Sequence, residues 1–170
     1  MQYHLNAQGK NETAMTAKHF LLLQGVATPF FNALGKALMG NGHRVTKLNF
    51  CGGDVLLSRD LPCLNINSNI TMLSQKVEYI LDSKEITDAI LFGDCRPIHQ
   101  AVINALKKKN IKIHVYEEGY FRPHWITLER NGVNGFSHYM KLSASDWLRH
   151  SLTLNHTTYY SKLGVNIQTL

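Results

Sequence analysis

Short apolar runs alternate along this chain with longer segments in which apolar residues recur every three or four positions. The runs have the length of buried strands, and they are residues 19–24, 45–50, 89–92 and 112–116. The longer segments have the spacing of helices, and they are residues 30–39, 72–83 and 98–109. Strands that alternate with helices of this length predict an α/β fold, a parallel sheet with helices on both faces.

The alternation stops after residue 120, and the rest of the chain has a different pattern. An Arg-Asn-Gly sequence at residues 130–132 is typical of a hairpin turn and lies between two short segments, residues 125–129 and 133–135. Residues 145–152 have helical spacing, with Ser145 as the expected N-cap. We therefore expect a hairpin and one short helix after the parallel sheet.

The length of 170 residues suits one domain with a core of its own. Residues 1–18 are a polar N-terminal extension, residues 19–137 form the α/β domain, and residues 138–170 form a divergent C-terminal tail. No run approaches the roughly 18 apolar residues of a membrane span. Residues 1–18 also lack the apolar core of a secretion signal, so a cytoplasmic location is expected.

The formal net charge of +6 raises the question of an anionic partner. The basic residues are dispersed, and the cluster at residues 107–109 falls at the expected C-terminal end of a helix, where cations are favoured. No nucleic-acid-binding motif is present, so we expect no nucleic acid partner. A nucleotide donor and a phospholipid surface both remain compatible with the charge.

Cysteine and histidine spacing argues against a disulfide framework and against a metal site. The three cysteines form no C-x-x-C pair, and the nine histidines show no H-E-x-x-H spacing. An odd number of cysteines suits a reducing compartment. The sequence therefore predicts no bound metal.

The stretch VYEEGYFRP at residues 115–123 carries the strongest candidate chemistry. Glu117 and Glu118 follow an apolar strand, and Arg122 comes four residues after them. The carboxyl ends of parallel strands open onto the ligand crevice of an α/β sheet, where a sugar-handling enzyme places an acid, a base or a nucleophile. The alternative is that both glutamates cap a turn and pair with surface cations.

A second stretch, ILFGDCRPIH at residues 90–99, repeats this arrangement. Asp94, Arg96 and His99 cluster around an expected helix N-terminus, which favours phosphate or carboxylate groups. A guanidinium binds such groups through two parallel hydrogen bonds, so Arg96 and Arg122 are the expected anchors. For His99, packing inside the helix is the alternative to ligand binding.

Polar residues also follow the two other predicted strands. Gln24 and Gly25 end the first strand, but one glycine is not a dinucleotide-binding motif. Asn49 and Asp54 flank a Gly-Gly loop after the second strand, where a plain connecting loop is the alternative. His124 shares the loop of the glutamate pair. Because the strands are parallel, these side chains should meet at one edge.

Five motifs together resemble those of the capsule polysaccharide biosynthesis and export family. They are LLQG at residues 22–25, GHRV at 42–45, NFCGGD at 49–54, LFGDCRP at 91–97 and EEGYFRPHWITLE at 117–129. The family comprises bacterial proteins of group 2-type capsules, similar to retaining β-Kdo glycosyltransferases. The resemblance extends from about residue 19 to residue 137.

The resemblance implies that this chain is the Rossmann-like first half of a GT-B-type glycosyltransferase. Such an enzyme transfers Kdo from CMP-Kdo to a phosphatidylglycerol-type lipid at the inner face of the cytoplasmic membrane. It implies no cofactor beyond the donor substrate, a peripheral location at that membrane, and other capsule biosynthesis or export proteins as partners.

The same resemblance assigns roles to the glutamate pair. Related transferases carry a catalytic acidic residue in a Glu-Asp-Gly motif, and Glu118 occupies the Asp position. A retaining mechanism requires a carboxylate near the anomeric carbon, and Glu118 is the expected one. Glu117 would orient it or share a proton with it. His124 stands where an Asp is common in the family.

The chain also departs from the family pattern. Family members are about twice as long, and their second domain holds the cytidine nucleotide through motifs that do not occur after residue 137. We therefore expect a truncated member with acceptor-side and catalytic residues but no donor site. Two alternatives are a non-catalytic module that recognises a lipid-linked glycan or an export partner, and a nucleotide-binding α/β protein outside this family.

Overall fold

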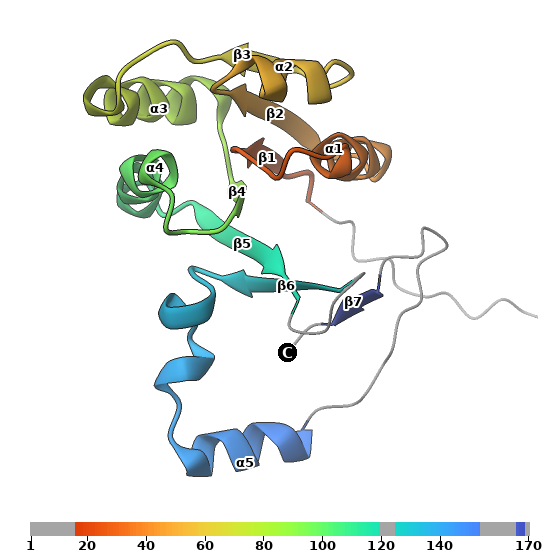
Figure 1. The fold of residues 1–170 in the computed structure, drawn as a ribbon, viewed down its shortest axis with the longest axis vertical. Helices are drawn as coiled ribbons and strands as arrows, with labels where there is room; N and C mark the ends of the chain where they lie inside the picture. Colours follow the sequence, from red (N-terminus) through yellow and green to blue (C-terminus); the bar gives the residue numbers. More distant parts are fainter. Residues whose placement is uncertain (1–15, 120–124, 154–165, 169–170) are drawn as a thin grey trace, which may run out of the picture.

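The computed structural model describes residues 16–119, 125–153 and 166–168 (Figure 1). The strands are β1 (His19–Leu22), β2 (Arg44–Asn49), β3 (Cys63–Asn65), β4 (Asp88–Phe92), β5 (Lys112–Glu118), β6 (Trp125–Arg130) and β7 (Asn166–Gln168). The helices are α1 (Phe30–Gly40), α2 (Gly52–Leu57), α3 (Ile70–Lys84), α4 (Pro97–Lys108) and α5 (Ala144–Thr153), with single 3₁₀ turns η1 (Asn134–Phe136) and η2 (Tyr139–Lys141).

The strands form one seven-stranded sheet in the order β3-β2-β1-β4-β5-β6-β7. Strands β1 to β5 are parallel, whereas β6 runs antiparallel to β5 and β7 runs parallel to β6. The order 3-2-1-4-5 is that of a doubly wound Rossmann sheet, so the predicted α/β class is confirmed. The strand order reverses between β1 and β4, which makes this the topological switch point.

Successive strand residues pack on opposite faces of the sheet, which explains the continuous apolar runs. Leu21 and Val115 join the core beneath α3 and α4, whereas Leu22 and Tyr116 join the core beneath α1. Figure 1 shows α3 and α4 on one side of the sheet and α1 on the other. Both faces are therefore buried, as a parallel sheet requires.

Local signals fix where the helices begin and end. The Asn69 side chain accepts a hydrogen bond from the Met72 N–H at 3.0 Å and caps α3, which ends at Glu85 in the left-handed conformation. Pro97 occupies the first turn of α4, where its missing N–H has no partner to lose. These boundaries lie within two residues of the predicted ones.

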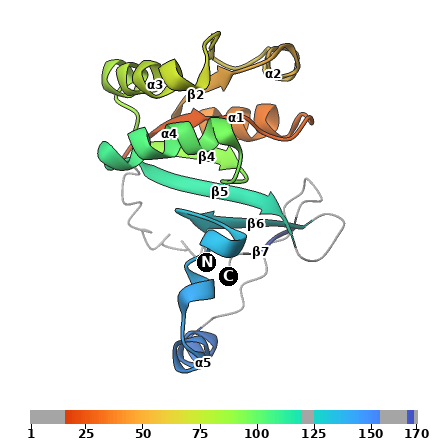
Figure 2. The ribbon, with the colours of Figure 1, turned by 60° about the vertical axis from the view of Figure 1, so that its left-hand side comes forward.

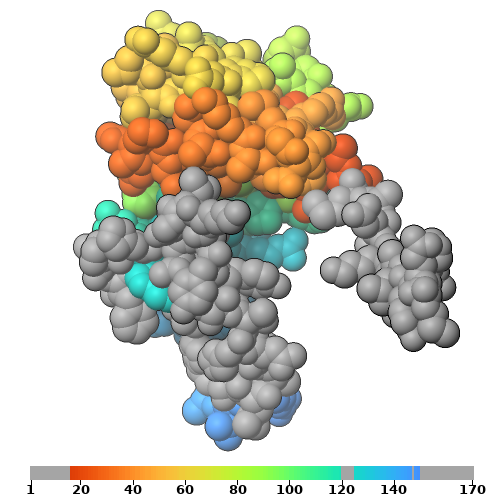
Figure 3. Space-filling model, turned by 90° about the vertical axis from the view of Figure 1, so that its right-hand side faces the viewer, coloured from red at the N-terminus to blue at the C-terminus, as the bar shows by residue number. Residues whose placement is uncertain are grey.

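The first helix packs against the segment that connects α2 to β3. Lys36 on α1 forms an ion pair with Asp60, and the Asn32 amide donates to the same carboxylate at 3.2 Å. In Figure 3 the orange surface of α1 borders the yellow surface of this segment. The sequence predicted neither α2 nor β3, because a six-residue helix and a three-residue strand are too short to show a period.

The predicted hairpin at residues 130–132 is wrong. Strand β6 pairs instead with β5, which precedes it, and residues 134–136 form η1 rather than a returning strand. The physical reason lies at Val133, whose N–H donates to the buried carboxylate of Asp94 at 3.0 Å. This bond ties the chain to the end of β4 and turns it away from β6.

Two features near the C-terminus differ from expectation. The helix expected to be capped by Ser145 begins at Ala144, and Ser143 caps it: the Ser143 Oγ accepts the Asp146 N–H, while the Asp146 carboxylate accepts the Ser143 N–H. Strand β7, which the sequence did not predict, pairs with β6. No helix in the described part of the chain has both the length and the apolar character to cross a membrane.

Candidate functional site

The carboxyl ends of β1, β2, β4 and β5 meet at one edge of the sheet because these strands are parallel. In Figure 2 the arrow of β5 points toward this edge and the arrow of β6 points away from it. Ligands of open α/β sheets bind at such an edge, next to the switch point. The polar residues predicted at the four strand ends should therefore lie beside a ligand site.

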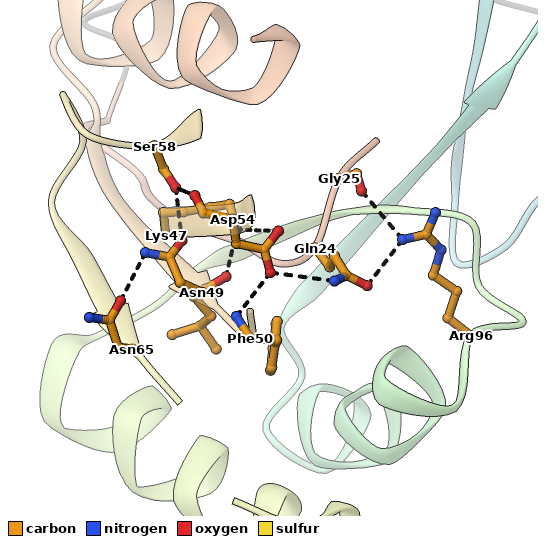
Figure 4. A network of polar contacts seen from close by, with 10 residues as sticks. Gln24, Gly25, Lys47, Asn49, Phe50, Asp54, Ser58, Asn65 and Arg96 are labelled. Carbon is orange, nitrogen blue, oxygen red and sulfur yellow. Dashed lines mark hydrogen bonds and ion pairs between the residues drawn. The ribbon is translucent and has the colours of Figure 1, made fainter. Parts of the chain in front are cut away.

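A chain of hydrogen bonds crosses the switch point (Figure 4). The Arg96 guanidinium donates to the side-chain oxygen of Gln24 at 3.1 Å and to the Gly25 carbonyl at 3.3 Å. The Gln24 amide donates in turn to Asp54 at 3.4 Å. The structure thus brings together four predicted site residues from the end of β1, the start of α2 and the loop after β4.

Asp54 compensates a buried cation that the sequence analysis missed. Lys47 is 3% exposed, and its ammonium lies 4.0 Å from the Asp54 carboxylate. Burial lowers the pKa of Lys47, and the Asp54 charge opposes that shift. Asp54 also accepts the Phe50 N–H at 2.9 Å, which fixes the start of α2. A lysine that interrupts the apolar run of β2 was the available sequence signal.

Asn49 has a structural place at the same edge. Its amide donates to Asn65 on β3 at 3.0 Å, and its carbonyl oxygen accepts the Ser58 hydroxyl at 2.8 Å. Ser58 also donates to the backbone carbonyl of Asp54. The buried Asn49 side chain therefore joins β2, β3 and α2.

Asp94 points away from this network, toward the loop after β6. Its carboxylate is buried and accepts the Val133 N–H at 3.0 Å and the Cys95 thiol at 3.4 Å. The hydrogen bond to Asp94 raises the pKa of Cys95. Asp94 therefore anchors a loop in this structure.

His99 is fully buried within α4. One ring nitrogen lies 2.6 Å from the Gly93 carbonyl, so it carries the proton and donates to that oxygen. Burial lowers the pKa of His99 and keeps the ring neutral. These contacts match the packing alternative stated for this residue.

The glutamate pair ends β5 beside the loop after β4. A carboxylate oxygen of Glu117 lies 3.2 Å from the position that a Cβ on Gly93 would occupy, and Gly93 has a φ of +65°. Glycine thus permits both the turn and the close approach of Glu117. The other Glu117 oxygen accepts the Glu118 N–H at 3.2 Å, while the Glu118 side chain is exposed. Arg122 and His124 lie outside the described residues.

Aromatic side chains that the sequence analysis did not single out support this edge from below. Tyr116 packs between Phe31 and Phe92, with ring centroids 5.2 and 5.0 Å apart, and burial raises the pKa of its hydroxyl. The Arg96 guanidinium lies 5.2 Å from the centre of the Phe92 ring. Arg96 is therefore held by an aromatic ring as well as by Gln24.

A small crevice lies beside the buried Lys47 near the switch point. The crevice lined by Gly25, Phe31, Lys47 and Asp54 has a volume of about 10 Å³. Among the described residues no group of three or more His, Cys, Asp or Glu side chains is placed to hold a metal ion. The edge therefore presents the glutamate pair next to side chains that are bound to one another.

Sequence comparisons add independent evidence. Residues 87–154 match the family model of capsule polysaccharide biosynthesis proteins. The chain is 35% identical over 124 residues to the capsule polysaccharide modification protein LipB of Neisseria meningitidis serogroup A, which covers 72% of this chain and 30% of LipB. It is 32% identical over 123 residues to the capsule polysaccharide export protein KpsS of Escherichia coli, covering 72% of this chain and 32% of KpsS. The chain thus spans about a third of the length of these relatives.

Proposed function

We propose that this chain, whose residues 87–154 match the family model of capsule polysaccharide biosynthesis proteins, supplies the catalytic carboxylate of a glycosyltransferase. The reaction proposed is transfer of Kdo from CMP-Kdo to a phosphatidylglycerol-type lipid at the inner face of the cytoplasmic membrane. The observation that carries the proposal is the glutamate pair at the carboxyl edge of β5. Other capsule biosynthesis and export proteins are the proposed partners.

The chemistry assigns different tasks to the two carboxylates. In a retaining transfer the bond between the anomeric carbon and the CMP oxygen breaks, CMP leaves with the electron pair, and a carboxylate stabilises or captures that carbon. The acceptor hydroxyl then bonds to the carbon, the bond from the carbon to the carboxylate breaks where one has formed, and the hydroxyl proton passes to the phosphate of the departed CMP. Glu118 is exposed and suits the first task, while Glu117 accepts the Glu118 N–H and holds the end of the strand.

The test uses Kdo transfer from a CMP-Kdo-generating system to a lysophosphatidylglycerol-type acceptor. The enzyme is a chimera in which the 124 aligned residues of this chain replace the matching segment of LipB. We expect Glu118→Gln to abolish transfer and Glu78→Gln, a similar change on α3, to leave it intact. The proposal would be overturned if the Glu118→Gln chimera still transferred Kdo. It would also be overturned if the folded native chimera transferred no Kdo while LipB did so in the same assay.

A non-catalytic binding module is the second candidate, and the paired side chains at the switch point favour it. Gln24 accepts a hydrogen bond from Arg96 and donates one to Asp54, so all three side chains already have partners within the protein. Such a module would recognise a lipid-linked glycan or an export partner. It predicts that glycan binding by this chain is the same for the native protein and for Glu118→Gln.

A further inference from the structure

A hollow of about 630 Å³ opens at the other edge of the sheet, where β5 begins and β6 ends. We call it the α4–β6 hollow. The last turn of α4, the end of β6 and the turns η1 and η2 form its walls; Lys107, Leu128, Arg130, Phe136, Tyr139 and Lys141 are among its lining residues. Its volume falls within the roughly 300–1,000 Å³ of small-molecule sites.

Three cations from three different elements face this hollow. Lys107 comes from α4, Arg130 from the end of β6 and Lys141 from η2. None of them forms an ion pair with a carboxylate of the described residues. In contrast, the adjacent Lys108 and Lys109 pair with carboxylates of α3. The cations of the hollow are therefore available to a ligand.

The one carboxylate of the lining does not neutralise these cations directly. Glu129 accepts the hydroxyl of Ser137, and the Ser137 oxygen accepts the Tyr139 N–H at 3.1 Å. Glu129 thus fixes the turn that carries η2 and Lys141. Asp94 holds the preceding loop through Val133. Hydrogen bonds of Glu129, Ser137 and Asp94 therefore fix the turns that carry the lining residues of the hollow.

The walls also contain apolar surface. Phe136 is 57% exposed and Leu128 is 37% exposed, and both line the hollow with the half-buried Tyr139. Small-molecule sites combine aromatic and apolar walls with a few placed polar groups. A ligand with charged groups and a ring fits this combination better than a bare ion does.

We propose that the α4–β6 hollow binds an anionic sugar, whose carboxylate or phosphate groups contact Lys107, Arg130 and Lys141 and whose ring lies against Phe136. A concave site of this size accepts one or a few sugar units, whereas a flat membrane surface would reach only its rim. The site lies at the opposite edge from the glutamate pair and does not depend on the function proposed for that pair.

The test is calorimetric titration of the intact 170-residue chain with three soluble probes. Trigalacturonic acid supplies rings and carboxylates, pyrophosphate supplies phosphate without a ring, and maltotriose supplies rings without charge. We expect trigalacturonic acid to bind, pyrophosphate to bind more weakly and maltotriose to show no binding. Tighter binding of pyrophosphate than of trigalacturonic acid would show a phosphate site that does not recognise a sugar ring, and it would overturn the proposal.

Lys107→Gln and Lys108→Gln form a matched pair, since both remove an exposed charge from the last turn of α4. We expect Lys107→Gln to weaken binding of the anionic probe about tenfold, as loss of one charged hydrogen bond does, and Lys108→Gln to leave it unchanged. Arg130→Gln should match Lys107→Gln, with an unchanged circular dichroism spectrum.

Three other outcomes would also overturn the proposal. Equal weakening by Lys107→Gln and Lys108→Gln would show that net charge rather than the hollow attracts the probe. Absence of binding at millimolar concentrations of both anions would show that the hollow is not an anion site. Binding only to phosphatidylglycerol vesicles, lost in Lys107→Gln, would assign the cations to a membrane surface instead.

Discussion

The two edges of the sheet use their charges in opposite ways. At the switch point Asp54 compensates the charge of Lys47, and Arg96 is held by Gln24 and the Phe92 ring. The crevice beside Lys47 has a volume of only about 10 Å³. At the α4–β6 hollow three cations without ion pairs among the described residues surround about 630 Å³. A charge at a strand end is thus evidence of a site only when its partners within the protein are known.

The largest effect is expected at the buried pair of the switch point. Asp54→Ala should lower the free energy of unfolding by about 3 kcal/mol, because it leaves the Lys47 ammonium buried without its compensating charge. Urea denaturation followed by circular dichroism measures this loss. The same assay on Lys141→Ala, in the α4–β6 hollow, should show a change below about 0.5 kcal/mol.

A double variant sharpens this prediction. Lys47→Met combined with Asp54→Asn removes both charges, and the Asn oxygen can still accept the Phe50 N–H. The double variant should recover most of the stability lost in Asp54→Ala, since no uncompensated charge stays buried. If Asp54→Ala unfolds at the same urea concentration as the native protein, the Asp54 charge does not compensate that of Lys47. The proposed difference between the two edges would then be wrong.

The next effect is expected at Gly25, where the chain passes over Phe31. A Cβ added there would lie 2.0 Å from the Phe31 ring, so Gly25→Ala should cost about 1–3 kcal/mol through displacement of that ring. Thermal unfolding measures the change. Gly53→Ala is the control, because its Cβ would meet only the Cys51 sulfur at 3.7 Å. An equal loss in both variants would contradict the packing argument.

The sheet could be predicted from the sequence because each element of its first five strands, except β3, carries its own signal. Strands buried on both faces gave apolar-rich runs, and apolar residues recur at helical spacing in α1, α3 and α4. The shared edge followed from parallel geometry. Four residues expected there, Gln24, Gly25, Asp54 and Arg96, do form one network.

The remaining features depend on contacts between segments distant in sequence. The residues around Val133 give no sign that its N–H donates to Asp94, which lies 39 positions earlier. This hydrogen bond is the reason why η1 forms where a hairpin was predicted. Strand β7 exists because β6 offers a free edge, which no local pattern shows. The convergence of Lys107, Arg130 and Lys141 likewise follows from the turns after β6.

An effect of similar size is expected at Asp94, which ties the loop after β6 to the end of β4. Asp94→Ala removes the acceptor of the buried Val133 N–H, so it should cost about 1–3 kcal/mol and also loosen the loop beneath the α4–β6 hollow. Binding of trigalacturonic acid should therefore weaken, although Asp94 does not line the hollow. Titration calorimetry and urea denaturation measure the two quantities. If Asp94→Ala were destabilised but bound trigalacturonic acid as the native protein does, the loop held by Asp94 would not support the α4–β6 hollow.

The smallest effect is a pH dependence that arises beneath the switch point. Burial lowers the pKa of His99 below its ordinary value of 6.5, so between the two values the unfolded chain binds more protons than the folded one. The contribution of neutral His99 to the free energy of unfolding should then be complete above about pH 6.5 and should fall as the pH drops below that value. His19 is shifted in the same direction and adds to the slope.

The role of His99 is tested by measuring the free energy of unfolding at pH 7.5 and at pH 5.5 and taking the difference between the two values. His99→Gln should reduce the difference, because the variant has no imidazole to titrate at this position. The absolute stability of His99→Gln also falls because its bond to Gly93 is altered. A smaller difference between the two pH values in His99→Gln would identify His99 as the titrating group. An unchanged difference would show that His99 does not cause the pH dependence.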